Sequence, residues 1–591
     1  MRLNIVKSKN AEQVYIIHSY RKNGKNTTCI HRKLGNMKSL IEIHGSREAA
    51  LDWAREEARK ETEKYDAEND DNQPVMVPHY PNRIIEKDEE RLFQVGYLFL
   101  QSIYYDLGIN KIVRNIRDRY KFEYDLNEIL RNLIYARILE PCSKRSSYDY
   151  VHTFADAPSY ELHDSYRALK VLASEFDYIQ SELFKNSRII TNREVSTLYY
   201  DCTNYYFEIE IDDGFRMFGK GKEHRPNPIV TMGLFMDSKG MPVAFDLYEG
   251  NKNEQLTLKP LENKIIRDFD IQEFIYCSDS GLASSTNKKL NSIHNRKYVI
   301  TQSLKKLKKD DKECALNPKQ FRKIGSEIFI DISQLDETND EVFNSIYYKE
   351  MPGATDDEII IVTYSPKYKK YQQSIREKQI SRANNLISSS SKIKNATKNP
   401  NDPKRFIAQT NTTENGEVAT ETHYSIDWDK IAEEAKYDGF YAVCTNLNDN
   451  VSKVIEINKR RWEIEECFRI MKTDFEARPV YVSTKESIKA HFLTCFMALL
   501  IYRILEEKLE YKYTITQTLE TLRSMKVLKK DEYGYSPAFK RTDLTDELHE
   551  KFGFRLDNEI IKKSKMRNIV SKTNIYANIR MYKNDHLKMY N

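Results

Sequence analysis

Two strand-like runs that each end on an acid constrain the fold more than any other feature of this chain. Val195–Asp201 is rich in β-branched and aromatic residues and closes on Asp201, and Phe274–Asp279 repeats the pattern and closes on Asp279. Runs of this kind predict buried strands. A single acid after a strand is usually a turn or cap residue. Two such strands in one segment favour a sheet edge that carries both carboxylates.

The residues around these strands predict how the sheet is built. Runs 228–236 and 241–248 are strand-like, and the turn Asp237–Gly240 between them indicates a hairpin. Residues 254–269 have helical spacing, and 298–301 is a further short strand after a helix. The order strand, hairpin, helix, strand, helix, strand predicts a mixed α/β sheet with helices packed on it.

A third acid lies on a helix whose faces differ in character. Arg461, Glu465 and Lys472 are spaced i, i+4 and i+11. At about 100° per helical residue, this spacing sets a cation, a carboxylate and a second cation on one stripe. A neighbouring apolar stripe predicts packing on a core; it consists of Ile457, Ile464, Phe468, Met471 and Phe475. An exposed helix with ordinary ion pairs fits the same spacing, but the two acids that end strands favour a joint site.

These motifs resemble the DDE transposases of bacterial insertion sequences. The group that is most similar carries the signature Tyr-x2-Arg-x3-Glu-x6-Lys, and this chain has Arg461-x3-Glu465-x6-Lys472. Asn458 stands at the tyrosine position, so the phosphate contact ascribed to that tyrosine is not carried over. The similarity covers residues 90–510, and the matching words are Tyr-Tyr-Asp201-Cys-Thr-Asn, Ser-Asp279-Ser-Gly-Leu, Gly250-Asn251, Tyr437-Asp-Gly-Phe440, Arg478-Pro-Val-Tyr481 and Ile488-Lys-Ala-His-Phe492.

The resemblance implies a ribonuclease H-like catalytic core in which Asp201, Asp279 and Glu465 are the catalytic acids and the metal ligands. Three neighbouring carboxylates repel one another unless divalent cations intervene. Oxygen ligands and a phosphodiester substrate favour two Mg²⁺ ions, with Mn²⁺ able to substitute.

The same resemblance implies DNA-binding residues around the acids. Arg461 and Lys472 are expected to hold phosphates, and Lys459, Arg460 and Arg469 to extend the track. Trp462 is expected either to stack on a flipped base or to pack in the core.

Composition and turn signals divide the chain into six regions. We expect, in order, a small β-rich N-terminal module with a helix, a helical DNA-binding region, the first part of the core, a β-rich insertion, the second part of the core, and a helical C-terminal region with a basic tail. Their bounds are 1–80, 90–190, 195–303, 304–435, 436–510 and 511–591. In relatives that form DNA hairpins, a β-rich insertion at this point covers the active site.

Two of these regions keep alternative interpretations. The helices of 90–190, with Lys144-Arg-Ser-Ser147 between them, fit a helix-turn-helix-like DNA reader or a purely structural bundle. The basic residues of 561–591 fit DNA contact or a solvated tail.

Composition narrows the class of protein. The 591 residues include 94 Lys and Arg against 89 Asp and Glu, so a net charge of +5 indicates local basic patches. The eight cysteines are scattered without a Cys-x2-Cys pair, which argues against a zinc site or a disulfide framework and fits a reducing cytoplasm. Residues 492–505 are apolar but short and interrupted by Tyr502-Arg503, so we expect a core helix and no membrane span.

The sequence therefore predicts a transposase that cuts an insertion element at its terminal inverted repeats and joins it to target DNA. The expected partners are double-stranded DNA, as element ends and target, and a second copy of the chain that pairs the two ends. The expected location is the bacterial cytoplasm, at the nucleoid. Two alternatives stay open: a nuclease of the same fold without strand transfer, and a domesticated, non-catalytic DNA-binding protein.

Overall fold

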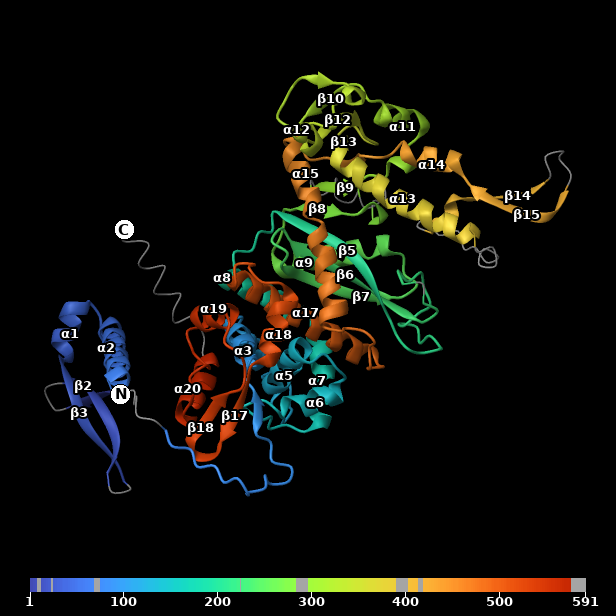
Figure 1. Cartoon of the computed structure of the whole chain (residues 1–591). Helices are drawn as coiled ribbons and strands as arrows, with labels where there is room; N and C mark the ends of the chain where they lie inside the picture. Colours follow the sequence, from blue (N-terminus) through green and yellow to red (C-terminus); the bar gives the residue numbers. More distant parts are fainter. Residues whose placement is uncertain are drawn as a thin grey trace. The chain divides into compact units, whose positions relative to one another are not determined.

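The chain forms two compact units, residues 1–85 and residues 86–591 (Figure 1). The structure is a computed structural model that describes residues 1–7, 12–22, 25–68, 75–223, 225–282, 288, 296–388, 402–412 and 418–574.

The N-terminal unit is a three-stranded antiparallel sheet with two helices. Its elements are β1 (Arg2–Lys7), β2 (Glu12–Lys22), β3 (Lys25–Asn36), α1 (Met37–His44) and α2 (Arg47–Glu68). The Ser46 hydroxyl accepts a hydrogen bond from the Ala49 N–H at 3.1 Å and caps α2, as its sequence position predicts. The dipeptide Asn23-Gly24, whose residue types favour a hairpin turn, lies outside the described residues, and strands β2 and β3 on either side of it pair as a hairpin.

The larger unit is built on one ten-stranded mixed sheet. Its strands follow the order β11-β10-β12-β13-β16-β9-β8-β5-β6-β7. Strands β5, β8 and β9 are parallel, and every other neighbouring pair is antiparallel. The bounds are β5 (Thr197–Tyr206), β6 (Ile229–Asp237), β7 (Pro242–Glu249), β8 (Ile275–Ser278), β9 (Lys297–Thr301), β10 (Phe321–Lys323), β11 (Phe329–Ile330), β12 (Tyr347–Pro352), β13 (Ile359–Tyr364) and β16 (Phe440–Thr445).

Strands β5 and β8 end at different positions relative to their acids. β8 ends at Ser278, directly before Asp279, as predicted. β5 does not stop at Asp201 but continues to Tyr206, because β6 pairs with it along its whole length. The acid is nevertheless at an edge on its other side, since the pairing of β5 with β8 ends at Tyr200.

Alternation along the strands divides the core between the two faces of the sheet. In β5, Leu198, Tyr200 and Cys202 lie in one hydrophobic cluster, and Tyr199 and Tyr205 lie in the other. Helix α9 (Leu258–Phe269) covers the face on which Leu198, Tyr200 and Cys202 lie. The second face is covered by α15 (Val451–Lys459), α16 (Trp462–Arg469) and α17 (Lys485–Lys508).

Helix α17 is the central helix of the larger unit. It is long and apolar enough to cross a membrane by length and composition, yet 94% of its most apolar window is buried inside the protein. It contacts strand β7 on one side and helices of the segment before the sheet on the other (Figure 1). Residues 492–505 are therefore part of a core helix, as the sequence predicts.

The helical region before the sheet shares its core with α17. It contains α3 (Tyr97–Asp106), α4 (Ile109–Arg117), α5 (Leu126–Leu139), α6 (Lys144–Val151), α7 (Leu162–Ser174) and α8 (Phe176–Ile190). A short strand β4 (Leu92–Gln94) precedes them where helix was expected, because it pairs with a strand near the C-terminus. Such a partner, far away in the sequence, leaves no local signal.

The C-terminal segment mixes helices with a hairpin. Its elements are α18 (Ile515–Ser524), β17 (Lys526–Lys530), β18 (Gly534–Pro537), α19 (Asp543–Phe552) and α20 (Lys563–Thr573). Strands β18, β17 and β4 form a small sheet, so the region is not purely helical as expected. The end of the predicted basic tail, 575–591, lies outside the described residues.

The segment between β9 and β16 extends the main sheet and then leaves it. Strands β10 to β13 continue the sheet, and α13 (Pro366–Ser388) follows β13 directly. The hairpin of β14 (Ile407–Thr412) and β15 (Val418–Ile426) extends away from the sheet near α13 (Figure 1). The described part of the segment also contains the shorter helices α11 (Lys309–Leu316), α12 (Asp340–Asn344) and α14 (Trp428–Ala435).

Candidate active site

The strand register places Asp201 and Asp279 on the same face of the sheet. Side chains alternate along a strand, so Asp201 shares the face of Tyr199 and Tyr205. Asp279 follows Cys277 by two residues, and Cys277 belongs to the same cluster. This is the face that α15, α16 and α17 cover, so both acids point toward the helix that carries Glu465.

The carboxylate of Asp201 is the most buried of the three acids. Burial raises its pKa to about 6, against the attraction of Lys222 and Arg461, and Asp279 adds repulsion. Its Oδ1 accepts a hydrogen bond from the Cys202 N–H at 2.8 Å. A negative charge at this position is therefore costly unless cations lie close to it.

Glu465 and Asp279 meet at the guanidinium of Arg461. Nη1 of Arg461 lies 3.2 Å from Oε1 of Glu465 and 3.9 Å from Oδ1 of Asp279. Burial opposes the charge of Arg461, but the carboxylates around it outweigh that cost and raise its pKa. The two acids are more open to solvent, with 45% of the Asp279 side chain and 59% of the Glu465 side chain exposed. Both can therefore accept a ligand from solution.

Lys472 reaches the same face of β5. Its ammonium donates a hydrogen bond to the Thr203 hydroxyl at 2.5 Å and lies 5.4 Å from the centre of the Tyr205 ring. Burial lowers its pKa to about 8, and repulsion from Lys222 adds to this while Asp201 opposes it. Lys472 therefore stands beside Asp201, whereas Arg461 stands beside Asp279 and Glu465.

The helix that carries these residues is not the single regular helix that the spacing predicts. It breaks between Lys459 and Trp462, and the segment Ile470–Asp474 after α16 is a π-helical turn. The break leaves Arg461 and Glu465 one turn apart, so their predicted pairing holds. The π turn directs Lys472 to β5, which explains its contact with Thr203 and not with Glu465. The predicted apolar stripe is buried throughout: Ile457, Ile464, Phe468, Met471 and Phe475.

The other predicted DNA-binding residues lie outside this group. Arg460 donates to the backbone oxygen of Ser238 at 3.1 Å and pairs with Glu456. Arg469 pairs with Glu466 and Asp474, at 2.6 Å and 3.0 Å. Both guanidinium groups are thus engaged by the protein.

Two further predicted residues face solvent. Lys459 ends α15 and is exposed. Trp462 is 61% exposed, so it does not pack in the core, and its stacking on a base stays a prediction.

Lys222 belongs to the site but was not predicted. It comes from the loop between β5 and β6, and its ammonium donates to the backbone oxygen of Cys202 at 2.5 Å. The loop is fixed by a close approach at Gly219, where a Cβ would lie 2.1 Å from the backbone oxygen of Gly250. The word Gly219-Lys-Gly-Lys222 is a local signal for a basic loop, but nothing in it points to Asp201.

Asn458, at the tyrosine position of the signature, bonds to a tyrosine from another strand. Its amide donates to the Tyr441 hydroxyl at 3.1 Å, and that hydroxyl lies 2.8 Å from the Thr301 hydroxyl. Tyr441 is in β16, on the face that α15 covers. The phenol next to Arg461 therefore comes from a strand and not from the helix.

The acids are suited to divalent cations. All three offer carboxylate oxygens, which Mg²⁺ and Mn²⁺ prefer. Asp201, Asp279 and Glu465 would hold such ions, which would supply stabilisation of negative charge at a phosphodiester. The raised pKa of Asp201 fits this role, because a bound cation offsets the cost of its buried charge.

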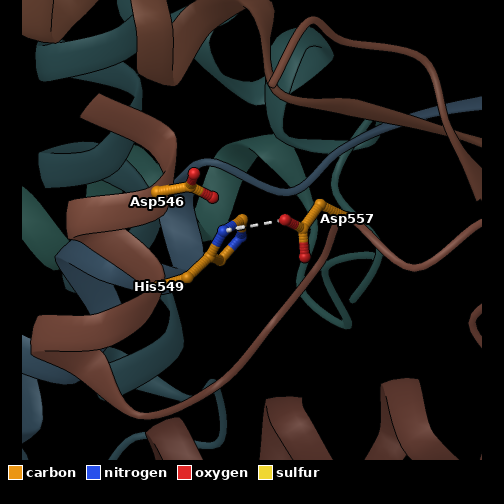
Figure 2. A group of neighbouring side chains, drawn as sticks. All are labelled: Asp546, His549 and Asp557. Carbon is orange, nitrogen blue, oxygen red and sulfur yellow. Dashed lines mark ion pairs between the residues drawn. The ribbon is translucent and has the colours of Figure 1, made fainter. Parts of the chain in front are cut away.

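A second acidic cluster has closer ligand atoms but different chemistry. This cluster consists of Asp546, His549 and Asp557, whose ligand atoms lie within 4.8 Å of one another (Figure 2). Among the described residues, it is the group of acids and histidines whose spacing could hold a metal ion. Nε2 of His549 accepts from the Leu556 N–H at 3.1 Å, so the neutral ring carries its hydrogen on Nδ1. That nitrogen faces Asp557 at 3.7 Å.

Arginines already balance the charge of this cluster. Arg541 and Arg555 lie 2.7 Å and 3.0 Å from the Asp546 carboxylate, and Arg555 lies 2.6 Å from Asp557. A protonated Nδ1 and two guanidinium groups leave no place for a cation, so we assign the cluster a structural role at the end of α19.

No curated protein matched. The solved structure of the piggyBac transposase synaptic complex with hairpin DNA is similar at 8% identity and a TM-score of 0.34, over 81% of this chain and 85% of that one.

Part of the chain also matches a protein family. Residues 212–501 match the family described as Transposase DDE domain. Asp279, Arg461, Glu465 and Lys472 lie within the matched segment, and Asp201 lies just before it. This part of the chain is therefore similar to the Transposase DDE domain.

Proposed function

We propose that this chain is a transposase that cuts DNA at the ends of an insertion element and transfers the cut strand to target DNA. The observation that carries the proposal is the gathering of Asp201, Asp279 and Glu465 on one face of the sheet, with Arg461 between two of them and Lys472 beside the third. The three acids come from three separate segments of the chain. A cluster of three carboxylates beside two cations is suited to phosphodiester chemistry.

The strand order supports a ribonuclease H-like core. The order β7-β6-β5-β8-β9, with a parallel pair on one side of β5 and an antiparallel hairpin on the other, fits that fold. Its third acid comes from a later helix packed on the sheet, as Glu465 does on α16. We infer that strands β16 and β13 to β10 are additions to this core.

The proposed reaction needs two Mg²⁺ ions, which Mn²⁺ can replace. Ions bound to these oxygens supply the activation of a water or a 3′-hydroxyl and the stabilisation of the leaving oxygen. The chain itself orients the substrate: Arg461 and Lys472 bind phosphates on either side of the acids, and Trp462 stacks on a base. Lys459 extends the phosphate track at the exposed end of α15.

The decisive test is cleavage and joining of DNA that carries the element ends. We expect Mg²⁺-dependent nicking by the wild type, and its loss in Asp201→Asn, Asp279→Asn and Glu465→Gln with end binding retained. Glu466→Gln is the matched control, because Glu466 follows Glu465 on α16 but pairs with Arg469. Cleavage at the wild-type rate by any of the three variants would contradict the role of that acid.

The products separate the proposal from its alternatives. Joined products support a transposase, whereas cut products alone would indicate a nuclease of the same fold. Binding without any cleavage would indicate a non-catalytic DNA-binding protein. The gathered acids favour the first two.

We also propose that two copies act together on paired ends of a bacterial insertion element. Phosphates of two duplexes neutralise basic surfaces that keep free copies apart. Light scattering should therefore report a dimer with end DNA and a smaller species without it. One protein per end that still cleaves at full rate would overturn the paired-end arrangement.

A further inference from the structure

Helix α13 presents two tyrosines on an exposed face. The rings of Tyr368 and Tyr371 are nearly parallel, with centroids 6.4 Å apart and an interplanar angle of 22°. Tyr368 is 37% exposed and Tyr371 is 61% exposed. Tyrosines one turn apart that stack on each other and stay partly exposed offer a platform for a planar ligand.

The start of α13 is fixed to the strand that carries Tyr441. Gly439, two residues before Tyr441, donates its N–H to Gln372 at 2.8 Å, and its carbonyl accepts from the Ser365 N–H at 2.9 Å. Gln372 directly follows Tyr371 on α13, one turn after Tyr368. The platform is therefore held rigidly beside β16.

Tyr441 links this platform to the acids. Its hydroxyl bonds to Asn458 and Thr301, and its phenol lies close enough to Arg461 to influence that residue. On the other side, Tyr441 is a neighbour of Tyr368: burial raises the pKa of Tyr368, and Tyr441 and Tyr371 add to the effect. The strand that carries Tyr441 thus lies between α13, which Gly439 contacts, and the side chain of Asn458 that Tyr441 contacts.

The exposed surface of α13 is basic. Lys367, Lys370, Lys378 and Arg382 are exposed on this helix, against the single exposed acid Glu377. Its two other cations are already paired, Lys369 with Glu337 and Arg376 with Asp438. An anion with planar groups complements such a surface, because the cations attract phosphates while the rings accept bases.

We propose that Tyr368 and Tyr371 bind unpaired bases of a DNA strand whose neighbouring phosphodiester lies at the acids, with Tyr441 marking the path between them. The inference rests on the proposed function and adds a binding surface to it. Base-paired DNA hides the faces of its bases, so these rings can stack only on nucleotides that have left the duplex. The platform therefore prefers a frayed or single-stranded end to an intact one.

The test compares two probes in the absence of divalent cations. One is a short fluorescent duplex with a single-stranded thymidine tail, and the other is the same duplex without the tail. Stacking on an aromatic ring depends little on base identity, so thymidine suffices. We expect Tyr371→Ala and Tyr368→Ala each to weaken binding of the tailed probe about tenfold, with binding of the blunt probe unchanged.

Two controls give the result its meaning. Tyr371→Phe and Tyr368→Phe keep the rings and should bind the tailed probe within about twofold of the wild type. Tyr533→Ala removes a tyrosine that is 38% exposed in the C-terminal segment and should change the binding of neither probe.

A fluorescent base reports the stacking directly. The fluorescence of a 2-aminopurine in the tail should be quenched on binding to the wild type and to the Phe variants, but not to the Ala variants.

Several results would overturn the inference. Equal losses on both probes would assign the tyrosines to duplex contact, and unchanged binding of the tailed probe would remove them from the DNA path. If either occurs while cleavage still depends on Asp201, the proposed function stands and only the platform fails. If the wild type neither binds nor cleaves DNA, both are wrong.

Discussion

The ammonium of Lys472 donates a 2.5 Å hydrogen bond to the hydroxyl of Thr203, two residues after Asp201 on the same strand. This contact ties the π-helical turn after α16 to β5, so a cation from a helix is fixed beside a buried carboxylate. It fixes the position at which Lys472 can bind a phosphate.

Replacing Lys472 should therefore weaken DNA binding in a charge-dependent way. We expect Lys472→Ala to lower the slope of log affinity against log salt by about one, because one phosphate contact is lost. Thr203→Val keeps the charge but frees its position, so it should weaken binding less and leave the slope unchanged. Fluorescence anisotropy across a salt series measures both. Lys453→Ala is the control, since Lys453 pairs with Asp449, and an unchanged slope in Lys472→Ala would return that lysine to a structural role.

Arg461 should have opposite effects on metal binding and on catalysis. Its guanidinium shares Asp279 and Glu465 with any incoming cation, so Arg461→Gln should bind Mn²⁺ about three- to tenfold more tightly. Cleavage should nevertheless fall, because a phosphate contact is removed. Isothermal titration calorimetry with Mn²⁺ checks the first effect. Arg460→Gln should leave Mn²⁺ affinity as it is, and the idea fails if Arg461→Gln does the same.

The loop that carries Lys222 should tolerate an added methyl group at Gly221 but not at Gly219. A Cβ at Gly219 would lie 2.1 Å from the backbone oxygen of Gly250, whereas a Cβ at Gly221 would meet nothing closer than 3.8 Å. We expect Gly219→Ala to lower the free energy of unfolding by about 1–3 kcal/mol and Gly221→Ala to be nearly neutral. Urea denaturation of the two variants decides this, and equal stabilities would show that the close approach does not exist.

Lys144 should make stability depend on pH. Its ammonium is buried with no hydrogen-bond partner among the described residues, and burial lowers its pKa from 10.5 to about 7, with repulsion from Arg137 adding to this. Between these two values the unfolded chain binds a proton that the folded chain lacks, so stability rises as pH rises. Lys144→Met should be more stable than the wild type by about 1–3 kcal/mol near neutral pH, with a gap that closes toward alkaline pH.

Denaturant unfolding at a series of pH values measures this gap. Lys170→Met, at an exposed position on α7, should show no such trend. A constant difference between Lys144→Met and the wild type would mean that the ammonium is not desolvated. The burial of Lys144 also implies that, within the basic word 144–147, it is not a DNA contact.

Local periodicity along the chain is enough to predict part of the site. A period of two residues sets which side of its own strand each of Asp201 and Asp279 occupies, and the helical spacing of Arg461 and Glu465 makes them neighbours. The apolar stripe of α16 sets which side of that helix meets the sheet. These relationships need only the immediate chain, because the backbone geometry of a strand or helix fixes them.

Tertiary structure decided what depends on partners far away in the sequence. β6 extends β5 beyond Asp201, and β17 turns residues 92–94 into a strand. Lys222 and Tyr441 join the site from a loop and a strand that carry no local mark of it, and the π turn sends Lys472 to Thr203. Such contacts are selected by packing and electrostatics between segments that meet only in the folded chain, so no pattern of neighbouring residues encodes them.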